Sequence, residues 1–203
     1  MGHFSRFLEP EWLDELPPDD PRAVRSRADL RRVNAIMGNA RIIARELGQA
    51  RRIADLGGGD GSLMQAVQHK LGRELDVTIV DRIAGLEVFD FLARPGKPLD
   101  AIVANLFLHH LTDADLRRLF TLAAARAPLL VACEPRRSRF ALGGARLMWF
   151  IGANDVTRHD AVLSVRAGFT DSELSSLWPV APGWSLIEKP APPFSHLFVA
   201  RHV

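Results

Sequence analysis

Glycines and aspartates between positions 55 and 81 have the types and spacing to bind a small charged molecule. The apolar run 53–56 indicates a buried strand, glycines follow at 57, 58, 59 and 61, and a helical pattern begins at Ser62. Such a turn brings the backbone close to a ligand, at a helix N-terminus where free N–H groups collect. A glycine-rich turn without a ligand is the alternative. The candidate binding residues are Asp55, Gly57, Gly58, Gly59 and Gly61.

The spacing of these glycines argues against a pyrophosphate ligand. Dinucleotide binding uses Gly-x-Gly-x-x-Gly, whereas this chain has Gly-x-Gly-x-Gly and then Ser62 where the third glycine would stand. A phosphate-binding P-loop would need Gly-Lys-Ser/Thr, and no lysine follows the turn. The carboxylate of Asp55 would repel a pyrophosphate but attract a cationic amine. The pattern therefore favours a ligand with a positively charged group.

The run resembles motif I of the class I S-adenosylmethionine (SAM)-dependent methyltransferases, whose cofactor carries an amino-acid end and no phosphate. A second apolar run, 76–80, predicts a strand that ends at Asp81. In the family, an acidic residue at this place accepts hydrogen bonds from both ribose hydroxyls of SAM, and a carboxylate has the lone pairs to do so. The resemblance implies that Asp55, Gly57 and Gly59 hold the methionine part of SAM and Asp81 its ribose.

The segment after Asp81 is shorter than the family requires. A parallel crossover with its own helix takes at least about 10–12 residues, and only 82–89 precede the expected end of a third strand at Asp90. We expect either a crossover reduced to a turn or a chain that lacks a segment here. The resemblance implies that Asp90 and Phe91 frame the adenine. The alternative is that Asp90 begins a short helix.

A strand predicted over 100–105 carries polar residues at its carboxyl end. Ligands of open α/β sheets lie beyond the carboxyl ends of the strands, so the methyl acceptor is expected here, with Asn105 and Leu106 beside the cofactor. The following His109 or His110 is a candidate general base for a phenol or an enol. Packing beneath the site is the alternative for each histidine. No carboxylate lies between positions 100 and 113, so we expect no metal ion of the kind that catechol methyltransferases use.

His159 is a third candidate base, on a helix predicted over 159–168. Neighbouring positions on a helix do not face the same way, so we expect no dyad between His159 and Asp160. Aromatic and apolar residues over 140–150 suit a hydrophobic acceptor pocket, although core packing explains them as well. The candidate pocket residues are Trp12, Met37, Met148, Trp149 and Arg166.

The arrangement of the predicted elements indicates an α/β fold. We expect a doubly wound, mostly parallel sheet of seven strands with the last strand antiparallel, in a single methyltransferase domain over residues 49–203. Residues 1–48 are expected to form an N-terminal helical arm, broken near Gly38, that is either a lid on the cofactor site or a structural cap or dimer arm. The later predicted strands are 129–133, 184–188 and 196–200, and the later predicted helices are 116–126 and 170–178.

The composition is that of a soluble globular protein, with 203 residues, 47% hydrophobic and 25% charged. The single cysteine, Cys133, excludes an internal disulfide and fits a reducing compartment. No run is long enough to cross a membrane and the N-terminus does not read as a signal peptide, so we expect a cytoplasmic protein. Arginines gather at 22–32 and 136–139 without an aromatic stacking platform, which argues against a nucleic-acid partner.

The resemblance implies transfer of a methyl group from SAM to an oxygen, or less readily a carbon or nitrogen, of a small apolar aromatic or polyketide-like metabolite. Two alternatives stay open. The short segment after Asp81 would fit a SAM-binding scaffold without catalysis, and the arginine clusters would fit an RNA or protein methyltransferase. A homodimer is compatible with either arrangement of the N-terminal arm.

Overall fold

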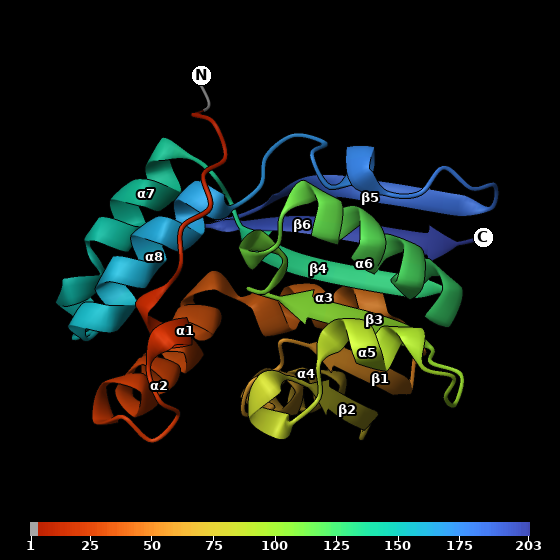
Figure 1. The fold of residues 1–203 in the computed structure, drawn as a ribbon, viewed down its shortest axis with the longest axis horizontal. Helices are drawn as coiled ribbons and strands as arrows, with labels where there is room; N and C mark the ends of the chain where they lie inside the picture. The colour runs from red at the N-terminus through yellow and green to blue at the C-terminus, as the bar shows by residue number, and fades with distance from the viewer. Residues whose placement is uncertain (1–3) are drawn as a thin grey trace.

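The computed structural model describes residues 4–203 and has helices on both faces of one sheet (Figure 1). The strands are β1 (Arg52–Leu56), β2 (Asp76–Val80), β3 (Ala101–Asn105), β4 (Leu129–Pro135), β5 (Trp184–Ala191) and β6 (Ser195–His202). Their order is β2-β1-β3-β4-β6-β5, in which β1 to β4 run parallel and β6 is antiparallel to both of its neighbours. The α/β class, the doubly wound arrangement and the reversed last strand are confirmed.

The described residues form six strands rather than the expected seven. The segment predicted to end a third strand at Asp90 forms instead a 3-10 turn, η1 (Arg82–Ala84), and a short helix, α5 (Val88–Ala93). A return to the sheet in parallel needs a long crossover, and this segment has no room for one beside a strand. Val88 and Leu92 of α5 are buried in the core instead. Strand β2 is therefore an edge of the sheet.

The central strands are apolar on both sides, as parallel strands covered on two faces must be. Ile53, Val103 and Val131 face a layer formed by α3 (Asn39–Leu47) and α4 (Ser62–Leu71). Their neighbours along the strands face the opposite layer, which α5 and α6 (Asp113–Arg126) form together with the last turn, η4 (Ser175–Leu177). The strands thus anchor two separate cores, with their carboxyl ends at one edge.

Four further helices lie beyond those carboxyl ends, at the left of Figure 1. They are α1 (Trp12–Glu15), α2 (Pro21–Met37), α7 (Arg139–Arg146) and α8 (Asp155–Ala167). Gly38, with φ 71°, separates α2 from α3, which confirms the predicted break in the N-terminal arm. No helix within 4–203 is long and apolar enough to cross a membrane.

The segment before β5 and the end of β5 differ from the sequence expectation. The helix predicted over 170–178 forms turns and only the short η4, because the carboxylate of Glu188 accepts hydrogen bonds from the N–H groups of Leu174 and Ser175 and draws this segment onto β5. Strand β5 continues through Pro190 to Ala191, beyond the predicted strand end. Pro190 is tolerated because β5 is an edge strand, where a missing N–H breaks no ladder.

Candidate functional site

The glycine turn between β1 and α4 has the backbone that its sequence predicts. Gly57, Gly59 and Gly61 have φ of 68°, 53° and 73°, a region that favours glycine. A β-carbon on Gly57 would lie 2.5 Å from the ring of Phe107, whereas one on Gly59 would meet nothing within 4 Å. The backbone at Gly59 is therefore open to a ligand, at the N-terminus of α4.

Asp55 places a carboxylate beneath this turn without a partner. The residue is 1% exposed, and neither carboxylate oxygen has a hydrogen bond. Burial raises the pKa of Asp55 to about 7, and the charge of Asp81 adds to the shift. A buried carboxyl group without a partner is costly to the fold. A cationic amine in the turn would supply the missing partner.

Asp81 follows the last residue of β2 and holds the glycine turn from the side. Its Oδ2 accepts a hydrogen bond from Gly59 N–H at 3.0 Å, and its Oδ1 accepts one from Ile83 N–H at 2.8 Å. Each carboxylate oxygen has a further lone pair. The structure thus brings Asp55, Asp81 and the glycines together, as the sequence spacing predicts.

A cavity of about 110 Å³ lies at the turn. Six of the predicted residues line it: Asp55, Gly57, Gly58, Gly59, Asn105 and Leu106. Helix α2 supplies the opposite wall with Arg27, Leu30, Arg31 and Asn34, and Arg31 forms an ion pair of 2.8 Å with Asp60 of the turn. Ligand pockets usually measure about 300–1,000 Å³, so α2 covers this site closely.

Sequence reasoning missed the residues of α2 individually, although it expected the N-terminal arm over the cofactor site. Arg27, Arg31 and Asn34 stand four and three positions apart, on one face of a helix, and that periodicity was the available signal. Asn34 Oδ1 accepts hydrogen bonds from the amides of Asn39 and Asn105, at 3.0 and 2.9 Å. This amide network fastens α2 and α3 to the end of β3.

The end of β3 also contains a strained residue. Leu106 has φ 51°, which a residue with a side chain adopts at a cost of about 1–3 kcal/mol. Its N–H donates to the carbonyl of Cys133 in β4, at 3.1 Å. The Cys133 thiol is buried, and burial raises its pKa to about 12. Cys133 therefore packs in the core, and Leu106 is held against the cavity.

His109 lies between two carboxylates that sequence reasoning did not single out. Its Nδ1 is 2.7 Å from Oε2 of Glu134, and its Nε2 is 3.5 Å from Oε1 of Glu11. Glu134 also accepts hydrogen bonds from the N–H groups of Phe107 and Leu108. Burial alone lowers the pKa of His109, but the two carboxylates outweigh it and raise the pKa to about 9. His109 is therefore an imidazolium at neutral pH.

His110 has the opposite electrostatic environment. Burial lowers its pKa, and the positive charge of His109, whose ring centroid is 4.2 Å away, lowers it further. Its Nδ1 lies 3.4 Å from Oδ2 of Asp14, and its side chain is 29% exposed. His110 is thus a neutral imidazole at pH 7 that a small molecule can reach, while its neighbour is charged and enclosed.

His159 lies with the N-terminal arm and does form a pair with Asp160, contrary to the expectation. Its Nδ1 is 2.9 Å from Asp160 Oδ1, and its ring stacks on Trp12 with centroids 3.8 Å apart. The Asp160 carboxylate also accepts hydrogen bonds from the N–H groups of Trp12 and Leu13. The pair forms because both side chains contact α1: the Asp160 carboxylate bonds to the N–H groups of Trp12 and Leu13, and the His159 ring stacks on Trp12.

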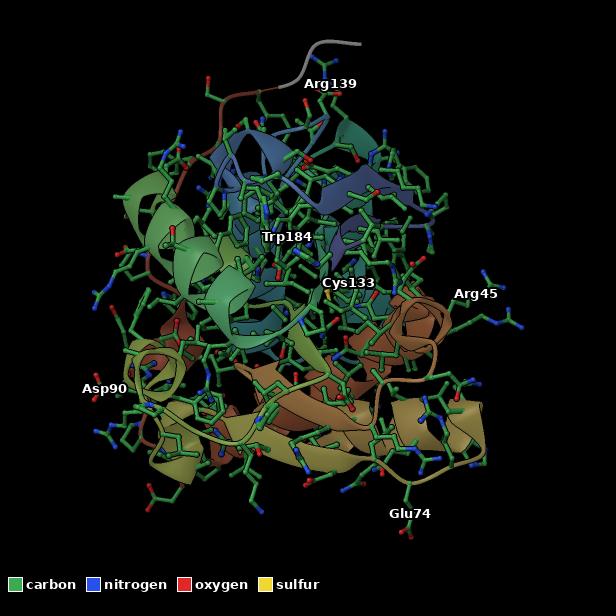
Figure 2. All side chains as sticks on the ribbon, turned by 90° about the vertical axis from the view of Figure 1, so that its right-hand side faces the viewer. Arg45, Glu74, Asp90, Cys133, Arg139 and Trp184 are labelled. Carbon is green, nitrogen blue, oxygen red and sulfur yellow. The ribbon has the colours of Figure 1, made fainter. Side chains whose placement is uncertain are left out.

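Two predicted adenine contacts lie away from the glycine turn. Asp90 and Phe91 line a second cavity, of about 480 Å³, together with Arg52 and Asp76 at the amino ends of β1 and β2. Asp90 forms an exposed ion pair with Arg94, at 3.4 Å, and Figure 2 shows it at the outer edge of the molecule. The short α5 directs both residues away from the carboxyl edge of the sheet.

The predicted pocket residues also lie outside the cavity at the turn. Met37 and Met148 are buried in packing contacts. Trp149 is 54% exposed and stacks on Phe150, with centroids 3.7 Å apart. None of Trp12, Met37, Met148, Trp149 and Arg166 lines either of the two cavities. The five predicted pocket residues therefore do not come together at the glycine turn.

Comparisons with protein-family models and with curated proteins give no match. Solved structures do match. The pyocyanin biosynthetic protein PhzM is 17% identical with a TM-score of 0.61, over 96% of this chain and 62% of that chain. Human N-acetylserotonin methyltransferase in complex with SAM is 15% identical with a TM-score of 0.57, over 95% of this chain and 62% of that chain.

A third similar structure is close to this chain in length. The plantazolicin methyltransferase BpumL, in complex with S-adenosylhomocysteine (SAH), is 12% identical with a TM-score of 0.63, over 91% of this chain and 92% of that one. The present chain thus spans about three fifths of the first two proteins and nearly all of the third. The fold is that of the class I SAM-dependent methyltransferases, as the resemblance of the glycine motif implied.

Proposed function

We propose that this protein is a SAM-dependent methyltransferase that transfers a methyl group to an oxygen of a small apolar aromatic or polyketide-like metabolite. The observation that carries the proposal is the buried, unpartnered carboxylate of Asp55 beneath an open glycine turn, beside Asp81. Similar structures support the reaction class, since they include human N-acetylserotonin methyltransferase and the plantazolicin methyltransferase BpumL.

The residues of the turn fit SAM in charge and in hydrogen bonding. Asp55 would receive the ammonium group, the backbone at Gly59 would face the methionine part, and the free lone pairs of Asp81 would accept the ribose hydroxyls. SAM supplies an activated methyl group on a sulfonium. The cavity of about 110 Å³ is smaller than such a ligand needs, so binding requires α2 to move away from the turn.

The protein has to align the acceptor and remove its proton. His110 is suited to accept the proton of a phenol because its pKa is lowered and its side chain is reachable. His109 is not, since Glu11 and Glu134 keep it charged. Its imidazolium instead holds the η2 turn (Leu108–His110) against β4, which positions His110. Alignment of acceptor and methyl group would supply much of the acceleration.

A SAM-binding scaffold without catalysis is the second candidate. The missing edge strand and the narrow cavity favour it. An RNA or protein methyltransferase gains no support, because arginines of both clusters are engaged in ion pairs within the molecule. These pairs are Arg22 with Asp20, Arg25 and Arg32 with Asp29, Arg31 with Asp60, and Arg137 with Glu173.

Transfer of labelled methyl groups from SAM to a panel of phenols and naphthols tests the proposal. We expect turnover in the wild type, a loss of at least tenfold in His110→Gln at pH 7, and recovery of part of that loss at higher pH as the phenol ionises itself. His202→Gln, on the exposed end of β6, is the matched control and should retain full activity. SAM binding without turnover on any acceptor would favour the scaffold.

A further inference from the structure

Glu11, His109 and His110 bring three possible metal-ligand atoms together, which the proposed reaction alone does not require. Each offers one ligand atom, and the three atoms lie within 4.8 Å of one another. Within residues 4–203, this is the group of histidine and carboxylate side chains whose geometry suits a metal ion. Glu11 comes from the N-terminal arm, about a hundred residues before the two histidines, so the fold rather than local sequence brings them together.

We propose that this cluster is a binding site for a divalent transition-metal ion such as Zn²⁺. Two histidines and one carboxylate, with an open position for a further ligand, are the donor set of many zinc sites and of other divalent d-block metals. In a tetrahedral zinc site the ligand atoms are about 3.3 Å apart. His109 Nε2 and Glu11 Oε1 are already 3.5 Å apart.

A buried ring nitrogen that makes no hydrogen bond also points to a ligand. His109 is 2% exposed, and its Nε2 makes no hydrogen bond in the described structure, with Glu11 Oε1 3.5 Å away. The other ring nitrogen is 2.7 Å from Glu134. Histidines that bind a metal commonly donate their second N–H to a carboxylate, which fixes the ring and leaves the first nitrogen for the ion. Glu134 orients His109 in this way.

The other two residues also have partners that would support them as ligands. Ser164 Oγ donates a hydrogen bond to Oε1 of Glu11. His110 Nδ1 lies 3.4 Å from Asp14 Oδ2. Each residue of the cluster is therefore held by a second polar group, and outer partners of this kind are a regular feature of protein metal sites. Side chains that lie near one another by chance would not need such outer partners.

The proposed ion would connect the N-terminal arm to the η2 turn at the end of β3. It would also occupy the lone pair of His110 that removal of an acceptor proton requires. The metal site therefore stands independently of the proposed methyl transfer, and the two uses of His110 exclude each other. If both are correct, Zn²⁺ inhibits methyl transfer and a chelator restores it.

Metal loading of the full chain tests the site directly. After treatment with chelator and dialysis against Zn²⁺, we expect one bound equivalent by atomic absorption. We expect Co²⁺ to give visible ligand-field absorption of a low-coordinate nitrogen and oxygen site. Glu11→Gln should weaken Zn²⁺ binding at least tenfold, whereas Glu9→Gln, an exposed position on the same arm, should have no effect. Circular dichroism would show that both variants fold.

Glu134, whose carboxylate lies 2.7 Å from His109 Nδ1, gives a second variant that keeps all three proposed ligands. Glu134→Gln should weaken Zn²⁺ binding about 10- to 100-fold, as loss of an outer carboxylate usually does. Absence of bound Zn²⁺ in the wild type would overturn the proposal and show that His109 is instead held between its carboxylates by a proton. Equal Zn²⁺ binding in Glu11→Gln and the wild type would overturn it as well. Either result leaves the SAM-binding measurements unaffected, so the two proposals fail separately.

Discussion

A β-carbon on Gly58 would lie 2.6 Å from Oδ2 of Asp55 and 2.9 Å from its Cγ. Real side chains do not approach so closely, so the backbone at Gly58 packs directly against the carboxylate. Glycine is required at this position by that close approach, since Gly58 is not among the glycines with positive φ. The carboxylate beneath the turn and the glycine above it therefore form one unit, which orients the candidate SAM site.

Gly58→Ala should displace the Asp55 carboxylate and weaken SAM binding at least tenfold, as titration calorimetry can measure. Gly143→Ala is the matched control, because this helical glycine of α7 has nothing within 4 Å of the added carbon. The control should bind SAM like the wild type and gain about 0.5–1 kcal/mol of stability. Unchanged SAM affinity in Gly58→Ala would contradict the role of this contact.

Asp55→Asn should stabilise the protein at pH 8. The folded pKa of about 7 lies above the ordinary value, so the Asp55 carboxyl favours the folded state most at low pH and that contribution is lost as pH rises through about 7. The variant should gain up to about 4 kcal/mol over the wild type at pH 8, and much less at pH 5. Urea denaturation of the variant and the wild type at pH 5 and at pH 8 measures this difference in the free energy of unfolding. An equal difference at the two pH values would exclude a buried titrating Asp55.

His109→Gln should destabilise the metal-free protein, and most strongly at low pH. The folded pKa of about 9 is above the ordinary value of 6.5, so the stabilisation is fully present below pH 6.5 and is lost as pH rises through 9. The variant should lose up to about 3 kcal/mol near pH 6 and progressively less above pH 9. His202→Gln, an exposed histidine, should show neither effect. A loss that does not change with pH would indicate packing alone.

Asp160→Ala should release the N-terminal arm. It removes the acceptor for the N–H groups of Trp12 and Leu13 and the partner of His159. Limited proteolysis should then cleave the segment before α2 several times faster than in the wild type, with a loss of about 1–3 kcal/mol of stability. Asp155→Ala, exposed in the first turn of the same helix, supplies the comparison. Equal cleavage of both variants would show that the arm is held by other contacts.

The sequence was sufficient to predict the fold class and the glycine turn. The apolar runs of β1, β3 and β4 and the glycines at 57, 59 and 61 are local signals, and local geometry decides them. The expected seventh strand was wrong because the family pattern was imposed on a segment that has too few residues for it. The segment after Asp81 has too few residues for both a crossover and a strand, and it forms the short helix α5 instead.

The contacts of the site were harder to predict because they join distant segments. Glu11 meets His109, and Asn34 meets Asn105, across separations that no periodicity reveals. The tryptophan at 149 illustrates the same limit, since an aromatic residue in an apolar run serves equally as core, pocket or exposed surface. Polar residues at strand ends were the dependable guide, and Glu134 at the end of β4 follows that rule although it was not singled out.

Calorimetric titration of the purified protein with SAM and SAH, beside an Asp81→Ala variant, tests directly whether the glycine turn is a SAM site. We expect micromolar binding of both ligands by the wild type and at least a tenfold loss in the variant, because Asp81 holds the glycine turn and would accept the ribose hydroxyls. Asp76→Ala, at the opposite end of the same strand, should bind like the wild type. No binding of SAM or SAH by the wild type would show that the glycine turn is not a SAM site.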